Sequence, residues 1–523
     1  MSRTHLSVLE SSASRFADRP AFKVPRVDSS TQEVVEWTSI TYSQFLHDVE
    51  HFAKYWSRTL HRDGIPQRSI IGMWIGGFTY TDALHIYGMC RAGYIPQLFS
   101  LRLPNPDVVF ELLGRSGARA LVYDASFAHS IRDAPVPTHL AVDASGEDLA
   151  GLALPTQPRV MADDVALYYH TSGSTSGRPK LVPYDYRWLE SAVHKSEQVS
   201  RPRDPARQDV SVWMGSMCHV GQSFMLIGSL QHGSCTIQPT AIAFSSDELV
   251  DMISRCGLNR LNQFAGFLVS HLRHAQADPK FHSILQGLEE ILYSGMPLPQ
   301  ADERWALQNG IPLINLLGST ECGAMMRGAD GILKPLHGTR YEFVPIEGGA
   351  DTGYESSARL LEMIIRGDSP DCPKGRRAVD GHFHTGDLFL EVIPGGYVYR
   401  GRDDDWIKSQ TSLRCDTRAI EDNARQTCGH LIAECIVVGS GRPSPAMFIE
   451  PVDSNMNADK IKREVIRKTR AFHSRRYLHE RITSTRMIIV VPRGTLPRTA
   501  TKGNVRRAAV EETYSSLLDE IYA

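Results

Sequence analysis

The segment that decides the fold class is rich in glycine and hydroxyl residues and reads Thr171-Ser172-Gly173-Ser174-Thr175-Ser176-Gly177-Arg178-Pro179-Lys180. It follows directly on the apolar run 165–169, which predicts a buried strand. Glycine lets the backbone approach a ligand closely, and successive N–H groups can then surround an anion, helped by the hydroxyls and Lys180. The segment therefore predicts a phosphate-binding loop, with a flexible Ser/Gly linker as the alternative. It is not a Walker loop, because Arg178 stands where that pattern needs its second glycine.

Alternating strand-like and helix-like segments surround this loop. An apolar run at 70–74 precedes helical spacing at 79–90, and residues 118–123 are apolar again, which predicts βα units and parallel sheet. Near residue 385 the pattern changes to a predicted hairpin around Pro394-Gly395-Gly396, followed by dense charge. The tail predicts helices at 416–426, 458–472 and 504–522 and strands at 435–438, 446–451 and 487–491. The sequence therefore predicts an α/β fold with a large βα-rich domain, residues 1–400, and a small α+β domain, residues 401–523.

Bulk composition restricts the class of protein. The chain has 523 residues, of which 42% are apolar and 22% charged, and its net charge is −2. This length exceeds what one hydrophobic core usually supports, and the near-neutral charge gives no reason to expect nucleic acid or an anionic membrane as a partner. The nine cysteines lack zinc-ligand spacing and predict reduced thiols that lie mostly in the core. We see neither a signal peptide nor a membrane-length apolar run, and therefore expect a cytoplasmic protein.

Further motifs follow the loop in a fixed order. They are Leu317-Gly318-Ser319-Thr320-Glu321, His384-Thr385-Gly386-Asp387, residues 401–408, and residues 496–503. Together with the loop they resemble the motif set of the adenylate-forming (AMP-binding) enzymes, which include acyl- and aryl-CoA ligases and the adenylation domains of nonribosomal peptide synthetases. The sequence is most similar to fungal synthetase-like and carboxylic acid reductase adenylation domains.

The resemblance implies a two-step reaction. A carboxylate attacks the α-phosphate of ATP and releases pyrophosphate, and the acyl adenylate then passes its acyl group to a thiol, either CoA or 4'-phosphopantetheine on a carrier protein. Lys502, Thr320, Glu321 and His219 are implied as catalytic residues, with Glu321 as the Mg²⁺ ligand. Asp404 is implied as the hinge of a mobile C-terminal domain.

The resemblance also implies a nucleotide site. Asp387 would accept hydrogen bonds from the ribose hydroxyls, and Leu317 stands where the family often has an aromatic residue over adenine. The implied nucleotide-binding residues are Thr171, Ser172, Gly173, Ser174, Thr175, Gly177, Lys180, Gly295, Met296, Pro297, Leu317, Gly318, Ser319, Asp387, Tyr399, Arg402 and Lys408.

The acid pocket is implied to involve residues from three segments, namely His219, Val220, Gly221, Phe264, Gly266, Phe267 and Gly295. Amino-acid-activating relatives usually carry an aspartate next to the position of His219, whereas this chain has Cys218 and Val220. An unpaired ammonium in an apolar pocket is costly. We therefore expect an aryl, unsaturated or short aliphatic acid rather than an α-amino acid.

Two departures from the family pattern leave alternatives open. The family order Gly-Lys is inverted to Lys502-Gly503, and Thr411 stands where the family usually has a glycine along the thiol passage. The alternatives are a stand-alone or excised adenylation domain that serves only a carrier protein in trans or a reductase, and a degenerate member that binds nucleotide without catalysis. A role in secondary metabolism is expected, and the sequence does not indicate an oligomeric state.

Overall fold

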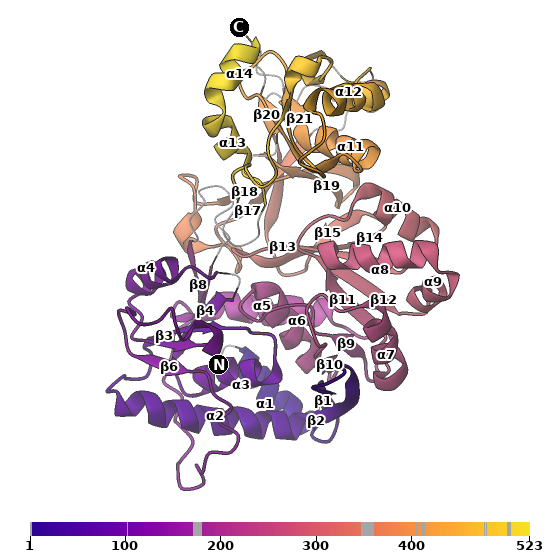
Figure 1. The fold of residues 1–523 in the computed structure, drawn as a ribbon. Coiled ribbons are helices and arrows are strands. Elements are labelled where there is room, and N and C mark those ends of the chain that lie inside the picture. Colours follow the sequence, from indigo (N-terminus) through magenta and orange to yellow (C-terminus); the bar gives the residue numbers. More distant parts are fainter. Residues whose placement is uncertain are drawn as a thin grey trace. The chain divides into compact units, whose positions relative to one another are not determined.

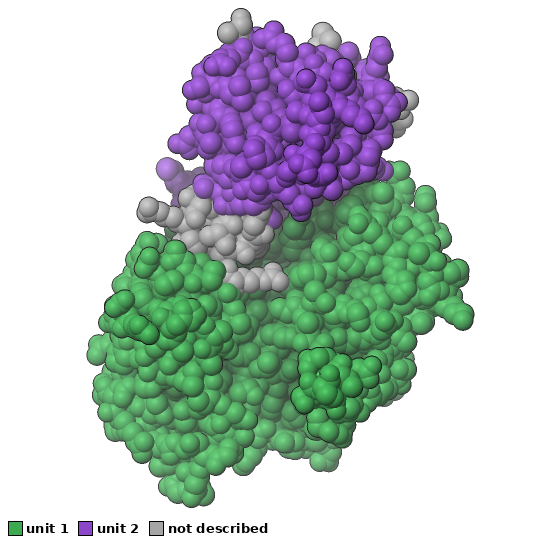
Figure 2. Space-filling view, viewed as in Figure 1, with its two compact units in different colours: residues 1–171, 180–340, 367–376 green, residues 172–179, 341–366, 377–523 purple. Residues whose placement is uncertain are grey.

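The computed structural model describes residues 3–101, 103–170, 180–346, 360–403, 406–408, 410, 414–474, 476, 478–498 and 504–522. The chain forms two compact units, shown in different colours in Figure 2. Unit 1 comprises residues 1–171, 180–340 and 367–376, and unit 2 comprises residues 172–179, 341–366 and 377–523. Among the described residues, no helix combines the length and apolar composition that a membrane crossing requires. The domain boundary predicted near residue 400 stays a prediction.

Unit 1 contains a sheet with the strand order β6-β5-β3-β4-β7-β8, in which only the last pair is antiparallel. These strands are β3 (Ile70–Ile75), β4 (Ile95–Ser100), β5 (Ala120–Tyr123), β6 (Thr138–Leu140), β7 (Val165–His170) and β8 (Leu181–Asp185). The predicted strands at 70–74, 118–123 and 165–169 are therefore confirmed.

A second run of strands in unit 1 has the order β15-β14-β13-β12-β11-β9-β10-β1-β2. Its central strands are parallel, and antiparallel pairs stand at its ends, so that the sheet is mixed rather than purely parallel. These strands are β1 (Pro20–Val27), β2 (Val34–Thr41), β9 (Val210–Val212), β10 (Cys235–Ile237), β11 (Arg260–Phe264), β12 (Glu290–Ser294), β13 (Leu313–Ser319), β14 (Gly323–Ala329) and β15 (Ile332–Pro335).

Local sequence signals set the ends of the helices in unit 1. Thr79 caps the helix predicted at 79–90 and forms a capping box with Asp82, whereas Gly117 and Gly257 end two helices in the left-handed conformation. The helices are α1 (His5–Arg15), α2 (Tyr42–Arg62), α3 (Tyr80–Arg91), α4 (Pro106–Ser116), α5 (Tyr186–Val199), α6 (Val220–Gln231), α7 (Ser246–Cys256), α8 (Ala265–Ala277), α9 (Pro279–Gln286) and α10 (Gln300–Gln308). Helices α5 and α6 pack side by side (Figure 1), and the largest buried cluster joins them to α2, α3, β3 and β7.

Unit 2 begins with an antiparallel sheet of order β16-β17-β18-β19, made of β16 (Tyr341–Pro345), β17 (Leu360–Ile365), β18 (Phe383–Ile393) and β19 (Gly396–Arg402). Strands β18 and β19 form the hairpin predicted around residues 394–396, with Ile393 paired to Gly396. The short pair β20 (Trp406–Lys408) and β21 (Arg414–Asp416) follows.

The C-terminal part of unit 2 is a small sheet with helices on both faces. Its strands are β22 (Ile432–Val438), β23 (Ala446–Pro451) and β24 (Ile488–Val490), and its helices are α11 (Thr417–Cys428), α12 (Ala458–Ser474), α13 (Arg507–Thr513) and α14 (Ser515–Tyr522). Met447 and Ile449 of β23 face the α11 and α12 side, whereas Phe448 packs with Val510 on the other side. The predicted α+β character is confirmed. The single helix predicted at 504–522 is wrong, because the helix ends at Tyr514 and a second helix starts at Ser515.

All nine cysteines are buried and none forms a disulfide, as the sequence predicted for core thiols. Burial raises the pKa of the Cys218 thiol to about 12, which keeps this sulfur protonated at neutral pH. The thiol is therefore a packing group rather than a nucleophile.

Ion pairs fix the segment 367–376 within unit 1, although residues of unit 2 flank it in sequence. Asp371 is fully buried, and its Oδ2 lies 2.9 Å from Nζ of the equally buried Lys195 on α5. Lys374 lies 2.6 Å from Asp163 and 2.8 Å from Asp185. A buried pair left without one partner leaves an uncompensated charge in the protein interior.

Asp371→Asn is expected to destabilise unit 1 by about 3 kcal/mol or more, because the Lys195 ammonium stays buried without a counter-charge. Urea unfolding, monitored by hydrogen exchange of the α5 amides, measures this loss of stability. The matched control is Glu36→Gln in the exposed pair with Arg26, which should cost less than about 1 kcal/mol. Equal losses in the two variants would contradict the role given to the buried pair.

Candidate active site

Three segments predicted to line the site leave the same edge of a parallel sheet. In β11, β12 and β13, Phe264 pairs with Ser294, and Ser294 pairs with Leu316. The Ser294 hydroxyl also donates a 2.7 Å hydrogen bond to the Leu316 carbonyl oxygen. Because parallel strands present their carboxyl ends at one edge, residues 264–267, 295–297 and 317–321 emerge there together.

The Phe264 side chain packs against two of the glycines near this edge. A Cβ atom added at Gly215 would lie 2.5 Å from Phe264 Cε2, and one added at Gly295 would lie 3.0 Å from Cδ1. Gly295 also has a φ of +87°, which favours glycine. Phe264 and Gly295 of the predicted acid pocket are therefore in contact, whereas Met296 is 59% exposed.

The loop that carries His219 is joined to residues 76–77. The Ser216 hydroxyl donates to the Gly76 carbonyl oxygen at 2.6 Å, and the Met217 N–H donates to the Gly77 carbonyl oxygen at 2.6 Å. A Cβ atom at Gly77 would lie 2.9 Å from the Met217 nitrogen, so this close approach requires glycine. His219 is the N-cap residue of α6, and the predicted pocket residues Val220 and Gly221 open this helix.

The turn between β13 and β14 carries the predicted residues Thr320 and Glu321. The Tyr184 hydroxyl donates to the Thr320 carbonyl oxygen, and the Lys195 ammonium donates to the Cys322 carbonyl oxygen at 3.0 Å. The Cys322 N–H in turn donates to the Ser319 hydroxyl at 3.2 Å. Lys195 therefore connects this turn to the buried Asp371, a role that no sequence motif indicated.

Glu321 is paired with an arginine that the sequence did not single out. Arg376 Nη1 lies 2.9 Å from Glu321 Oε1, and both side chains are partly buried. Among the described residues, no group of three or more His, Cys, Asp or Glu side chains could hold a metal ion. A single, partly exposed carboxylate fits Mg²⁺, which usually takes one or two carboxylates together with phosphate oxygens and waters.

The predicted ribose-binding residues meet on the β18–β19 hairpin of unit 2. Asp387 pairs with Arg402 across the two strands, and Arg402 Nη1 lies 3.6 Å from Asp387 Oδ1. The Tyr399 hydroxyl lies 3.3 Å from the same carboxylate oxygen. Gly386 has a φ of +70° and lies close to the Arg402 guanidinium. The hairpin thus brings Asp387, Tyr399 and Arg402 together.

Several predicted residues lie outside the described part of the chain. They are the loop residues Thr171, Ser172, Gly173, Ser174, Thr175 and Gly177, the hinge residue Asp404, and Lys502. Lys180 is exposed directly before β8, and Lys408 ends β20. The roles predicted for all of these residues stay predictions.

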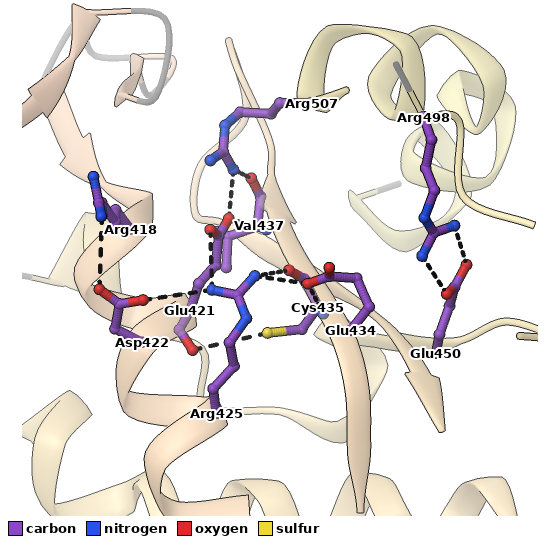
Figure 3. Close-up of polar contacts among 10 residues, drawn as sticks. All are labelled: Arg418, Glu421, Asp422, Arg425, Glu434, Cys435, Val437, Glu450, Arg498 and Arg507. Carbon is purple, nitrogen blue, oxygen red and sulfur yellow. Dashed lines mark hydrogen bonds and ion pairs between the residues drawn. The ribbon is translucent and has the colours of Figure 1, made fainter. Parts of the chain in front are cut away.

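The segment that contains Lys502 is bounded on its N-terminal side by Arg498. Figure 3 shows this guanidinium reaching both carboxylate oxygens of Glu450 on β23, at 3.1 and 2.6 Å. The Leu496 N–H donates to the same carboxylate at 2.9 Å. Because Glu450 is buried, this bidentate ion pair fixes the position of Arg498, which precedes the segment that contains Lys502.

On its C-terminal side the segment leads to Arg507, the first residue of α13. Arg507 Nη1 lies 2.7 Å from Glu421 on α11 and also donates to the Val437 carbonyl oxygen (Figure 3). Glu421 accepts the Val437 N–H at 2.7 Å. An antiparallel bridge pairs Arg498 with Val505, so the described residues on the two sides of the segment lie next to each other.

The family assignment follows from comparison with known sequences. A model of the AMP-binding enzyme family matches residues 9–345, and a model of the AMP-binding enzyme C-terminal domain matches residues 404–523. The chain therefore belongs to the AMP-binding enzyme family and is by class an adenylate-forming ligase.

Relatives of known name cover most of the chain. The AMP-binding domain-containing enzyme iboA of Amanita muscaria is 37% identical over 95% of this chain and 98% of its own length. The adenylate-forming reductase Nps11 of Serpula lacrymans is 24% identical over 96% of this chain, which spans about half (48%) of that reductase. Carboxylic acid reductase of Mycobacterium tuberculosis is 25% identical over 60% of the chain. The predicted resemblance to fungal and reductase adenylation domains is confirmed.

Solved structures show the same fold. O-succinylbenzoate coenzyme A synthetase from Bacillus subtilis superposes with a TM-score of 0.74 at 17% identity over 98% of both chains. The adenylation domain of a carboxylate reductase from Mycobacterium chelonae gives a TM-score of 0.73 at 16% identity, covering 99% of this chain and 91% of that domain. The predicted α/β fold with a large N-terminal and a small C-terminal domain is thereby confirmed.

Glu450→Gln is expected to lower the free energy of unfolding of the C-terminal sheet by about 2 kcal/mol at pH 7, because charged hydrogen bonds to Arg498 are lost. Burial opposes ionisation of Glu450, but the bonds from Arg498 and Leu496 hold its pKa below the usual 4.5. The stabilisation is therefore present above pH 4.5 and is lost as the pH falls through the lower folded value. Hydrogen exchange of the β23 amides, compared at pH 7 and at a pH below 4.5, measures this stabilisation.

The control for this variant is Glu464→Gln on the surface of α12, where Glu464 pairs with the exposed Arg467. This change removes a carboxylate of the same type from the same unit and should have a much smaller effect. An effect of Glu450→Gln that does not shrink in acid would contradict the assignment of the stabilisation to the ionised carboxylate.

Proposed function

We propose that this ligase activates an aryl, unsaturated or short aliphatic acid with ATP and passes the acyl group to a thiol. The carboxylate oxygen attacks the α-phosphorus, the bond to the β-phosphate breaks, and pyrophosphate leaves. A thiolate then attacks the acyl carbonyl carbon, and AMP leaves with the electrons of the broken C–O bond. The acceptor is CoA or the phosphopantetheine of a carrier protein in trans.

The observation that carries this proposal is the shared edge of β11, β12 and β13. It brings the predicted acid-pocket residues Phe264 and Gly295 next to the segment 317–321, which is predicted to hold the α-phosphate and the metal. Adenylation needs an acid and a phosphate in one place, since orientation supplies much of the rate enhancement. An anthranilate–CoA ligase of Pseudomonas aeruginosa and a benzoate–CoA ligase of Thauera aromatica are among the relatives, which supports an aryl acid.

Several residues of this chain have proposed roles at the nucleotide. Asp387 accepts hydrogen bonds from the ribose hydroxyls, and Arg402 lies beside it. Glu321 would hold Mg²⁺, which would neutralise charge on the phosphate oxygens when bound. Lys502 places a compact positive charge between the acid and the α-phosphate. A B. subtilis relative solved with ATP and magnesium, and a Rhodopseudomonas palustris relative solved with ATP, support these two ligands.

ATP–pyrophosphate exchange across a panel of aryl, unsaturated and aliphatic acids tests the first step. Lys502→Ala is expected to reduce the exchange rate by at least about a hundredfold, because the lost charge stabilises the transition state, while ATP binding changes little. The exposed Lys460→Ala on α12 is the control and should leave exchange unchanged.

If the folded protein shows no pyrophosphate exchange with any acid of the panel, the proposal is overturned. That result would favour a nucleotide-binding protein without catalysis. Exchange that is unaffected by Lys502→Ala would show that another residue carries the charge. The acceptor is determined separately, by incubating the best acid with CoA and with an added phosphopantetheinylated carrier protein. The cytoplasmic location and the role in secondary metabolism stay predictions.

The Arg376–Glu321 pair predicts a competition between arginine and metal for one carboxylate. Arg376→Gln frees Glu321 and is expected to lower the Mg²⁺ concentration for half-maximal exchange about threefold or more, whereas Glu321→Gln should raise it. Direct titration of Mg²⁺–ATP by calorimetry gives the same comparison without turnover.

Lys374→Gln is the matched control for this competition. Lys374 lies two residues away on the same short helix but pairs with Asp163 and Asp185 instead of Glu321. Its removal should leave the Mg²⁺ requirement unchanged. A requirement that responds equally to both variants would mean that only general positive charge is involved.

A further inference from the structure

A cavity of about 30 Å³ lies in the core of unit 1, beneath the first two turns of α6. Four of its lining residues are Val220, Ser223, Phe224 and Ile227, which follow the i, i+3, i+4, i+7 spacing of a single helix face. This face begins one residue after His219, and its first member, Val220, is also a predicted residue of the acid pocket. The cavity and the predicted acid pocket therefore share Val220.

The wall of the cavity is mostly apolar, but it contains a histidine. His5, the first residue of α1, lines it together with Tyr87, and the two rings meet edge to face with centroids 4.8 Å apart. His5 is only 8% exposed. Neither its Nδ1 nor its Nε2 has a hydrogen-bond partner within the described part of the protein.

An unpaired imidazole is an unfavourable group at this position if packing is its only task. Each buried polar atom without a partner costs free energy, and a phenylalanine would make the same contact with Tyr87 at no such cost. Burial lowers the pKa of His5 to about 4, so the ring is neutral at physiological pH. A neutral imidazole presents one donor and one acceptor toward its surroundings.

We propose that His5 is a specificity-determining residue, whose imidazole hydrogen-bonds a hydroxyl group at the end of the acid remote from the activated carboxylate. This inference rests on the proposed function and names the class of substrate, a hydroxy acid. His5 takes no part in the bond-making steps.

The chemistry of the cavity favours a hydroxyl over other polar groups. A hydroxyl both donates and accepts, and it therefore suits either tautomer of the neutral His5. A second carboxylate or an ammonium would have to be buried among apolar side chains without an opposite charge. The volume is sufficient for a group the size of one or two waters, and hence for a hydroxyl.

The experiment compares acids that differ by one hydroxyl, such as 4-hydroxybenzoate with benzoate and 6-hydroxyhexanoate with hexanoate. The wild-type protein is expected to favour the hydroxy acid of at least one pair by about tenfold or more in kcat/KM of pyrophosphate exchange. His5→Phe keeps the aromatic contact with Tyr87 and should abolish this preference. His5→Gln keeps a donor and an acceptor and should retain part of it.

The control variant is His271→Phe. His271 is also buried, and its ring centroid lies 5.4 Å from that of Phe244, which belongs to a different core cluster. Its substitution should leave the ratio between paired acids unchanged, so that a change in ratio reports on the cavity rather than on stability.

Each outcome supports or overturns the inference. An unchanged ratio in His5→Phe would mean that the imidazole holds only a water, and a preference of the wild type for dicarboxylic acids or unsubstituted acids would exclude the hydroxyl. The wild-type comparison needs no variant, so poor folding of His5→Phe does not prevent a decision. If no acid supports exchange, the proposed function itself fails, whereas exchange without hydroxyl preference overturns this inference alone.

Discussion

Parallel pairing of β11, β12 and β13 is the constraint on which the candidate active site depends. Side chains alternate between the two faces of a strand, so a slip of one residue would move Phe264 to the opposite face. The hydrogen bond from the Ser294 hydroxyl to the Leu316 carbonyl oxygen joins neighbouring strands at the end where the site begins. It opposes such a slip at the place where a slip would separate the acid segment from the phosphate segment.

The turn that follows β13 depends on a buried ion pair, Lys195–Asp371. Lys195 reaches the Cys322 carbonyl oxygen and Asp371 together, so a single ammonium joins α5, the turn and the segment 367–376. Replacing such a pair with apolar side chains often costs little stability, and stability alone is therefore a weak reason for it. Its directed hydrogen bonds instead fix the position of Glu321, one residue before Cys322, which apolar packing would not do.

How much of this could be predicted depended on the range of the signals. The strand at 165–169, the hairpin around residues 394–396 and the buried strand 446–451 follow from local apolar patterns and turn residues, which a single sequence contains. The break of the last helix at Tyr514 was missed, because the residues on either side fit one continuous helix. Tertiary packing decides such boundaries.

The partners of the site could not be predicted for a different reason. Arg376, Lys195 and His5 stand in no motif. Each of them contacts a residue far away in the sequence: Arg376 is 55 positions from Glu321, Lys195 is 127 positions from Cys322, and His5 is 82 positions from Tyr87. A sequence pattern gives the type of residue and its spacing along the chain, but not which distant side chain will meet it. The motif residues Asp387 and Arg402 were found because the family resemblance carried that spatial information.

Three arginines in the described part of the chain already have carboxylate partners before any substrate binds. Arg376 contacts Glu321, Arg402 lies beside Asp387, and Arg498 contacts Glu450. A polyanionic nucleotide that approaches Arg376 or Arg402 must therefore exchange one anionic partner for another instead of neutralising a bare charge. Because the gain and the loss are of the same kind, such exchange contributes more to orientation and selectivity than to raw affinity. Arg498 differs from the other two, because its carboxylate is buried in the β-sheet of its own unit and the pair is held by two hydrogen bonds. This pair is suited to fixing the protein chain, whereas the pairs of Arg376 and Arg402 are suited to exchange with a ligand.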